Sequence, residues 1–240
     1  AHSRGRRRLD RHAPGDRRPF RAVRAAAPAR QSSGGERGAV VVTDRRLDAE
    51  DCLLALARLA VDAGAAEGPE EALWVITRAV APMLGDPAAA RRPDAFRETP
   101  PPAVGVAAAA FMRVPPAGTH HMIVAPVNFA PRQHHELVEI TLGHPGEVAR
   151  SRRPLLLRDT ALHPSFVKIL QSFRAGSAIF APLLWRGDYL GVLICANAAR
   201  GAFSERDLAA LRAFAGLAAA VWIAQGGPAW LAGIDTTGLP

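Results

Sequence analysis

The chain is poor in cysteine and has no long hydrophobic runs. Its 240 residues include two cysteines, Cys52 and Cys195, which are far apart and lie among apolar neighbours. This usage argues against a disulfide framework and favours a reducing compartment, which we take to be the cytoplasm. The longest apolar runs, 103–112 and 213–224, fall short of the roughly 20 residues that cross a bilayer, so no membrane span is expected. The first residues lack the apolar core of a secretory signal, so none is expected.

An excess of charge of one sign is also missing from most of the chain. The formal net charge is +8, but residues 1–37 alone carry eleven arginines and three acidic residues, and the other 203 residues carry 19 of each sign. The arginine-rich segment 1–38 shows no sustained apolar period and is predicted to be disordered. Three roles stay open for it: an arm that binds nucleic acid or anionic lipid, a solvated tail without a partner, or an extension from a misplaced start site.

Motifs of the common catalytic classes are absent from the sequence. There is no GxxxxGK[ST], HExxH or GxSxG motif and no paired-carboxylate signal. Cys195 lies within an apolar run, where a buried thiol behaves as a small hydrophobe with a raised pKa. We therefore predict no catalytic residue, and the sequence identifies no cofactor.

Apolar periodicity predicts an ordered domain over residues 39–227. Helices are expected over 48–63, where Asp48 caps the start with Asp51 three residues on, and over 69–84. Between them and the C-terminus, apolar runs separated by turn residues predict a sheet core over 104–197.

The end of the predicted domain is marked by clear turn and cap signals. Two apolar strands flank Arg186-Gly187-Asp188, which predicts a tight hairpin. A helix over 204–225 follows, and Ser204 with Asp207 has the spacing of a capping box. Residues 228–240 are predicted to form a short tail with Trp230 and Leu231 as anchors.

Seven short motifs follow one another in the second half of the chain. They are Gly146-Glu147-Val148-Ala149, Arg153-Pro154-Leu155-Leu156-Leu157-Arg158-Asp159, His163-Pro164-Ser165-Phe166, Ser177 to Pro182-Leu183-Leu184, Arg186-Gly187, Leu190-Gly191-Val192-Leu193 and Phe203-Ser204-Glu205. In this order the series resembles a GAF domain, and the resemblance covers about residues 50–225.

The resemblance implies an α+β, PAS-related fold. A six-stranded antiparallel sheet would carry the terminal helices on one face and pocket-forming helices and loops on the other. Members of the family bind cyclic nucleotides, bilins, haem, small anions or amino-acid derivatives in that pocket, and many dimerise through their terminal helices. No output module follows the last predicted helix, so we expect this domain to act in trans on a signalling partner protein.

The candidate ligand-binding residues come from three segments, 119–135, 163–173 and 177–181. In the second of these, residues at three- and four-residue spacing form one apolar face of a predicted short helix, which by the resemblance would cover the pocket. Core packing is the alternative interpretation of that face. The candidates are His121, Met122, His135, Phe166, Ile169, Leu170, Phe173, Ser177 and Ile179.

The two histidine pairs are not predicted to form a metal site. Neighbours on a strand point to opposite faces, which separates His120 from His121. If His134 and His135 begin a helix, their side chains diverge by about 100°. A site built from one histidine of each pair is the alternative that stays open.

Small side chains are frequent along the helix predicted over 204–225, and small residues allow a second helix to approach closely. We therefore expect a homodimer formed through the terminal helices. A sensory domain that binds a small molecule is the favoured function. A degenerate GAF scaffold without a ligand is the alternative. An enzyme resembling methionine sulfoxide reductases is disfavoured, because neither cysteine matches the pocket loops in which those enzymes carry theirs.

Overall fold

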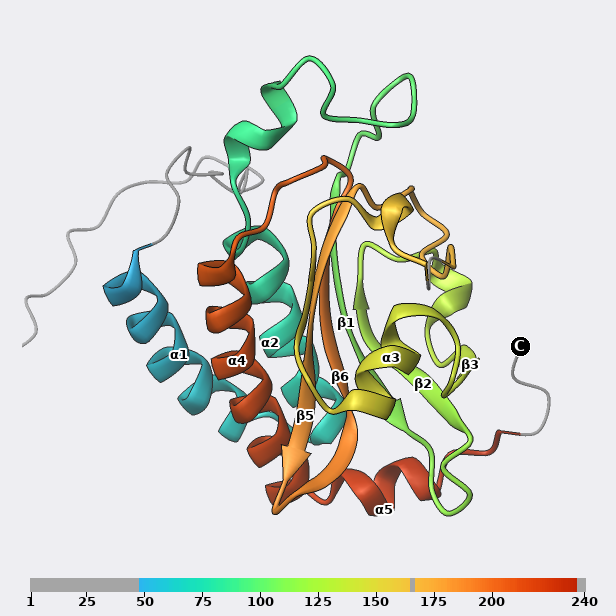
Figure 1. Ribbon diagram of the computed structural model, residues 1–240. Helices are drawn as coiled ribbons and strands as arrows, with labels where there is room; N and C mark the ends of the chain where they lie inside the picture. Colours follow the sequence, from blue (N-terminus) through green and yellow to red (C-terminus); the bar gives the residue numbers. More distant parts are fainter. Residues whose placement is uncertain (1–47, 165–166, 237–240) are drawn as a thin grey trace, which may run out of the picture. The chain divides into compact units, whose positions relative to one another are not determined.

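The computed structural model of the chain describes residues 48–164 and 167–236. The arginine-rich segment 1–38, with its predicted disorder and its possible contact with nucleic acid, lies outside the described residues. The described part contains a six-stranded antiparallel sheet in the order β3-β2-β1-β6-β5-β4 (Figure 1). The strands are β1 (Val106–Arg113), β2 (His120–Val127), β3 (Leu137–Glu139), β4 (Leu155–Leu157), β5 (Ser177–Trp185) and β6 (Asp188–Asn197).

The central strands are apolar on both faces because both faces are covered. In β1, Ala108, Ala110 and Met112 join one apolar cluster, while Ala107 and Phe111 join another on the opposite side. The alanine run has a low strand propensity, yet β1 forms because it is paired on both sides, with β2 and with β6. Burial and pairing thus decide this strand rather than local preference.

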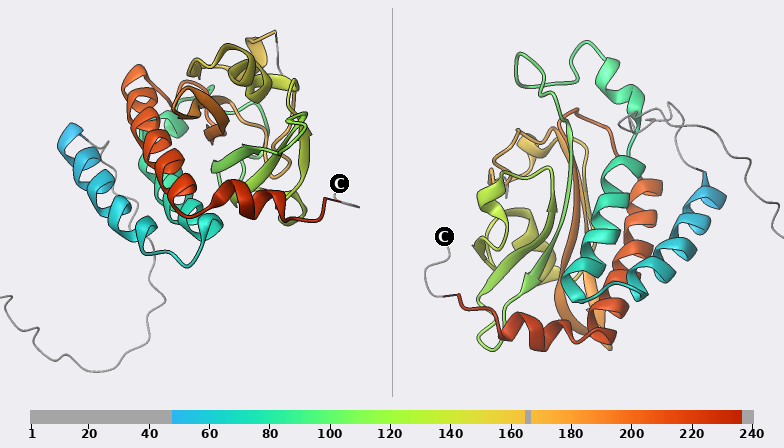
Figure 2. Two further views of the ribbon diagram at one scale, coloured as in Figure 1. Left: turned by 90° about the horizontal axis from the view of Figure 1, so that it is seen from below. Right: turned by 180° about the vertical axis from the view of Figure 1, so that it is seen from behind.

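Three long helices lie on the first side of the sheet, two of them directly on its face and the third packed on those two (Figure 2). They are α1 (Ala49–Gly64), α2 (Pro69–Met83) and α4 (Glu205–Ala224). Helices α2 and α4 contact the strands and each other, and α1 packs on α2 and α4. The capping boxes predicted from Asp48 with Asp51 and from Ser204 with Asp207 are both present. In each helix the two side chains of the box accept hydrogen bonds from backbone amides that have no partner within the helix.

Helix α4 has the length and hydropathy of a membrane-crossing helix, and it is the one such helix among residues 48–164 and 167–236. Half of its apolar window is buried in the fold. Phe214, Ala218 and Trp222 are at most 2% exposed and belong to the core between α4, α2 and the sheet. This burial is the pattern of a core helix.

Shorter elements cover the second face of the sheet. Helix α3 (Gly143–Ser151) packs on β5 and β6, and the 3-10 turns η2 (Pro131–Gln133) and η3 (Thr160–Leu162) belong to connections on the same side. A further 3-10 turn, η1 (Pro87–Arg91), follows α2. The apolar cluster on this face is smaller than the one under the helices.

Two predictions of local structure are wrong. Residues 228–240 do not form a tail throughout, because α5 (Gly227–Ala232) begins directly after α4 and buries Leu231 to 2% exposure. The helix predicted over 163–173 is absent from the described part of that segment, which has no regular structure from residue 167 on. Its apolar spacing is helical, but the side chain of Gln133 bonds to the carbonyl of Ile169 and to the amide of Gln171 where a helix would bond its own backbone groups.

Candidate functional site

A small cavity lies between the second face of the sheet and the segment 167–175, which we call the roof segment. Its volume is about 60 Å³. That is well below the roughly 300–1,000 Å³ of pockets for drug-sized ligands, so the cavity in this form holds a molecule of only a few heavy atoms. The residues that line it are Phe111, Phe129, His144, Pro145, Thr160, Val167, Lys168, Ile169, Leu170, Arg174, Ala175, Ala178, Phe180, Ile194 and Ala196.

Strand alternation supplies the floor of the cavity. Ala178 and Phe180 of β5 lie opposite Ala196 and Ile194 of β6, so these four side chains share one face of the sheet. The neighbouring residues in β5 point to the helices. The small alanines beside the aromatic ring leave the space that the cavity occupies.

The side chain of Gln133 holds the roof segment in place. Gln133 is fully buried; its Nε2 donates to the carbonyl of Ile169 at 2.9 Å, and its Oε1 accepts from the amide of Gln171 at 3.0 Å. Arg132 adds a bond from its Nε to the side-chain oxygen of Gln171 at 2.7 Å. The roof is therefore tied to the loop between β2 and β3 by a few side-chain bonds and not by its own helix.

His144 is a buried polar group on the cavity wall, at 5% exposed. It is the second residue of α3, and its ring lies 4.9 Å from the ring of His163 and 5.7 Å from that of Phe180. Burial, followed by the charge of His163, lowers the pKa of His144 to about 4, against an opposing effect of Glu147. The imidazole is therefore neutral at pH 7, with one ring nitrogen a donor and the other an acceptor.

Positive charge borders the cavity at the roof. Arg174 and Lys168 both line it, and Lys168 Nζ lies 3.9 Å from Glu98 Oε1 at the exposed side. The hydroxyl of Thr160, also on the wall, donates to the carbonyl of Ala175. An apolar floor with two cations and a neutral imidazole suits a small molecule that has an apolar body and an anionic or hydrogen-bond-accepting end.

The sequence-predicted site residues divide between the two faces. Ile169 and Leu170 line the cavity. The prediction that Met122 and Ile179 line the same pocket is wrong, because strand alternation puts them in the cluster under the helices. Ser177 lies two residues before Ile179 in β5 and therefore on the same face of the strand. Its hydroxyl donates to the carbonyl of Ala199 at 2.7 Å. Phe166 lies outside the described residues.

The other three candidates lie near the cavity or away from it. His121 and Phe173 are buried on the cavity side of the sheet without lining the cavity. His121 Nε2 lies 2.8 Å from the hydroxyl of Tyr189. The placement of His135 in the pocket is wrong, because its ring contacts Glu70 of α2 and Trp230 of α5.

The expected divergence of His134 and His135 is also wrong. Their ring centroids lie 4.0 Å apart. Helix η2 ends at Gln133, so His134 is extended and His135 has a positive φ of 65°. The cavity is also lined by Phe111, Phe180, His144 and Arg174, which are not among the predicted residues. Phe111 and Phe180 lie in strands that are apolar on both faces, so the sequence does not show which face lines the cavity. His144 and Arg174 belong to no motif.

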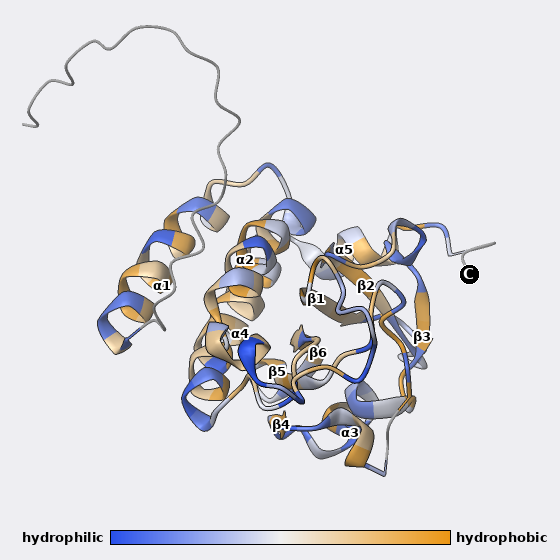
Figure 3. Ribbon diagram, turned by 90° about the horizontal axis from the view of Figure 1, so that it is seen from above, coloured by the Kyte–Doolittle hydropathy of each residue, from blue (hydrophilic) through white to orange (hydrophobic). Residues whose placement is uncertain are grey.

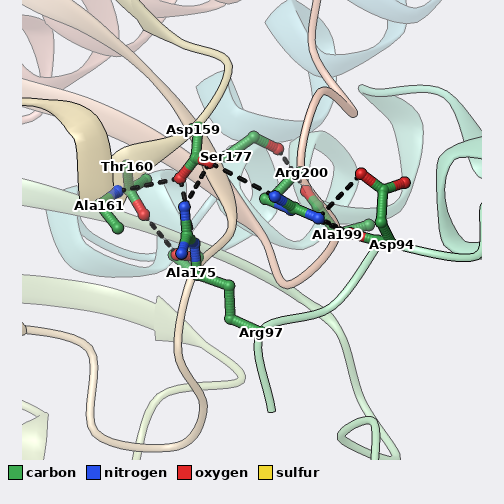
Figure 4. Close-up of polar contacts among 9 residues, drawn as sticks. All are labelled: Asp94, Arg97, Asp159, Thr160, Ala161, Ala175, Ser177, Ala199 and Arg200. Atoms are coloured by element: carbon green, nitrogen blue, oxygen red, sulfur yellow. Dashed lines mark hydrogen bonds and ion pairs between the residues drawn. The ribbon is translucent and has the colours of Figure 1, made fainter.

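A network of charged residues borders the η3 end of the roof segment (Figure 4). Asp159 accepts from Arg97 Nη2 at 2.5 Å and from the amide of Ala161, and Arg200 Nη1 lies 3.8 Å from it. Burial by itself raises the pKa of Asp159, but the bonds from Arg97 and Ala161 and the two arginine charges outweigh it and hold this pKa below its usual range. Arg200 also contacts Asp94 at 2.9 Å, so the network joins three segments.

Replacing Asp159 by asparagine is expected to lower the free energy of unfolding by about 2 kcal/mol at pH 7. The change leaves Arg97 and Arg200 without their shared carboxylate, and breaking such a partly buried pair costs more than an exposed pair contributes. Urea unfolding measures the loss. The matched control is Asp62→Asn on the exposed side of α1, for which a change within about 0.5 kcal/mol is expected. Equal losses in both variants would contradict the structural role of the network.

The antiparallel sheet, with long helices on one face and a covered pocket on the other, defines an α+β domain. The family model named "GAF domain" matches residues 68–222, more than half of the sequence. The chain therefore belongs to the GAF domain family. Domains of this family commonly serve as sensory or regulatory ligand-binding modules.

Solved structures share the fold at low sequence identity. The GAF domain of a phosphoenolpyruvate-protein phosphotransferase from Coxiella burnetii is 20% identical, with a TM-score of 0.59, covering 75% of this chain and 99% of that one. The corresponding domain from Acinetobacter is 15% identical, with a TM-score of 0.58 and coverage of 75% and 97%. The free methionine-R-sulfoxide reductase from Neisseria meningitidis is 14% identical, with a TM-score of 0.54 and coverage of 78% and 99%. No curated protein matches the chain.

Proposed function

We propose that this GAF domain is a sensory module whose cavity binds a small molecule with an apolar body and an anionic end. The observation that carries the proposal is the apolar cavity bordered by Arg174 and Lys168, with the neutral imidazole of His144 on its wall. Occupancy would change the position of the roof segment, and a partner protein would respond in trans. This is a shift between two arrangements of the domain, driven by the ligand's preference for one of them.

The size and charge of the cavity narrow the ligand class. A space of about 60 Å³ admits a few heavy atoms unless the roof segment moves. The roof segment is held over the sheet by the side chain of Gln133, so opening it disrupts a few hydrogen bonds and no helix. Short aliphatic carboxylates therefore fit the closed form best, since their alkyl group suits the floor and their carboxylate suits Arg174.

A binding role is proposed in preference to a catalytic one because of where the thiols lie. Cys195 is fully buried in the apolar cluster under the helices. Burial, together with the charge of Asp207, raises its pKa far above the ordinary range. Cys52 is on α1. Neither sulfur lines the cavity, so thiol chemistry of the sulfoxide-reductase kind has no nucleophile beside the ligand.

A homodimer and a cytoplasmic location complete the proposal. On α4, the small residues Ala209, Ala213 and Gly216 are exposed at the spacing of one helix face. On the neighbouring α1, Leu53 and Leu54 are 67% and 64% exposed, an unusual amount of apolar surface for a helix that packs on one side only (Figure 3). This is the surface that we propose for a second copy, and native mass spectrometry of the full chain reports whether a dimer forms.

The test of the ligand class compares short aliphatic carboxylates with their primary amides. A carboxylate present at ten times its Kd is expected to raise the melting temperature by about 3 °C, because binding to the folded state alone contributes about 1.4 kcal/mol. The amide of the same length is expected to raise it less. Arg174→Gln is expected to remove the difference between acid and amide, and Ala178→Leu is expected to remove both shifts by filling the cavity.

Ala196→Val serves as a milder filling variant if Ala178→Leu folds poorly, since overpacking costs about 1–3 kcal/mol. No shift in the wild type, together with bare protein in native mass spectra, contradicts the sensor and favours the scaffold. The scaffold has one observation in its favour: the rings of Phe111, Phe129 and Phe180 already occupy much of the space beneath the roof.

A further inference from the structure

Three metal-ligating side chains that do not line the cavity meet between α2 and the residues that follow η2. Glu70, in the first turn of α2, lies 64 residues before His134 in the chain, yet its Oε1 lies 2.5 Å from His134 Nε2. The same oxygen lies 3.0 Å from His135 Nε2. One ligand atom from each of these residues lies within 4.8 Å of the others. A carboxylate and two imidazoles thus share one small volume.

The backbone brings the two imidazoles to the same side. The amide of His135 donates to the carbonyl of Ile123 at 2.9 Å, and the amide of Ile123 donates to the carbonyl of Glu136 at 3.0 Å. These two bonds hold His135 at its positive φ of 65°. Adjacent side chains in an extended chain would point apart; the left-handed conformation of His135 makes them converge.

Two tryptophans fix the rings from either side. The edge of His134 meets Trp74 of α2 at 5.9 Å between ring centroids, and His135 meets Trp230 of α5 at the same distance. Trp230 in turn packs on Trp222 of the core at 5.7 Å. The imidazoles are therefore positioned by the fold rather than left on a free loop, and such support is what a metal site needs from its surroundings.

The donor set and its exposure match a particular kind of ion. Two imidazole nitrogens and one carboxylate oxygen are the ligands that Zn²⁺ and neighbouring divalent transition metals take, with one position left for water. The side chain of His134 is 41% exposed, which leaves a path for the ion and its water. Glu70 and Glu71 also offset the positive end of the α2 dipole, which would otherwise oppose a cation.

Little movement is needed to admit the ion. Zinc–nitrogen and zinc–oxygen bonds of about 2.0–2.1 Å in tetrahedral geometry put ligand atoms about 3.3 Å apart. The two distances to Glu70 Oε1 are 2.5 and 3.0 Å, so the side chains open by less than about 1 Å each. We propose that Glu70, His134 and His135 form a binding site for a divalent transition-metal ion, with Zn²⁺ as the preferred ion. The proposal is independent of what the cavity binds.

The experiment titrates the full chain, first stripped with a chelator, with Co²⁺ and Zn²⁺ at pH 7.5. Co²⁺ is expected to give visible absorption bands of four-coordinate geometry at one equivalent, and Zn²⁺ is expected to displace it. Glu70→Gln and His134→Gln are each expected to weaken binding by more than the roughly 10–100-fold that loss of an outer-shell partner costs. His135→Asn keeps a residue that tolerates positive φ and is expected to do the same.

The matched controls are Glu71→Gln and His120→Gln. Glu71 occupies the same turn of α2 but pairs with Arg78 at 2.9 Å, and the side chain of His120 lies 3.0 Å from that of Thr119. Both controls are expected to bind Co²⁺ and Zn²⁺ as the wild type does. Circular dichroism checks that each variant folds. Binding that persists unchanged in Glu70→Gln or His134→Gln overturns the proposal, and so does a wild type that binds neither ion at one equivalent.

Discussion

Gly191→Ala is expected to lower the free energy of unfolding by about 3–5 kcal/mol, or to prevent folding. Gly191 lies in β6, the strand between β1 and β5, and its partner in β1 is Met112. A Cβ at this position would lie 2.3 Å from the carbonyl oxygen of Phe111 and 3.0 Å from the Cα of Met112. Both are backbone atoms of the adjacent strand, so neither can turn aside as a flexible side chain would.

Gly187→Ala in the turn between β5 and β6 is the matched comparison. Gly187 has a φ of +89°, but a Cβ there would meet no atom within 4 Å. Its replacement therefore costs only the conformational strain, about 1–2 kcal/mol. Urea unfolding of the two variants separates close approach from strain. If both variants lose the same stability, the tight contact between β1 and β6 does not carry the cost that we assign to it.

Acid is expected to destabilise the domain well above the pH at which its carboxylates protonate. The pKa values of His121 and His144 are both lowered to about 4, mainly by burial and then by the charges of Arg113 and His163 respectively. In the unfolded chain each histidine takes up a proton near pH 6.5. Between pH 6.5 and 4 the unfolded state therefore binds more protons than the folded state, and stability is lost as the pH falls.

The size of this loss is about 2–3 kcal/mol for each histidine at pH 4.5 relative to pH 7. His121→Gln is expected to be less stable than the wild type at pH 7, because its contact with Tyr189 changes, yet to lose less stability on acidification. Urea unfolding at pH 4.5 and at pH 7 measures the free energy of unfolding of both proteins. A pH dependence in His121→Gln as steep as in the wild type would refute the assignment.

Local signals in the sequence predicted most of the fold. Ser204 and Asp207 define the start of α4 because a capping box depends only on residues three apart. Arg186 and Gly187 form the hairpin turn because both adopt the positive φ that such turns require. The six-stranded sheet with helices on one face, predicted from the resemblance, is confirmed by the pairing of the strands.

The site was harder to predict because it depends on contacts between distant residues. Strand β5 is apolar on both faces, so its sequence does not say whether Ile179 or Phe180 faces the cavity. The roof segment has helical spacing, yet it has no regular structure, and the side chain of Gln133 bonds to its backbone. The meeting of Glu70 with two histidines depends on the positive φ of His135, which is fixed by a hydrogen bond to Ile123.

Lys168 is the only lysine in the sequence. It lies on the roof segment at the rim of the cavity, and its side chain is 51% exposed. An amine-reactive fluorophore therefore has one side-chain target in this protein, apart from the amino group of the chain terminus. Labelling at Lys168 turns the roof segment itself into an optical reporter, whose emission would follow movement over the cavity without any engineered residue.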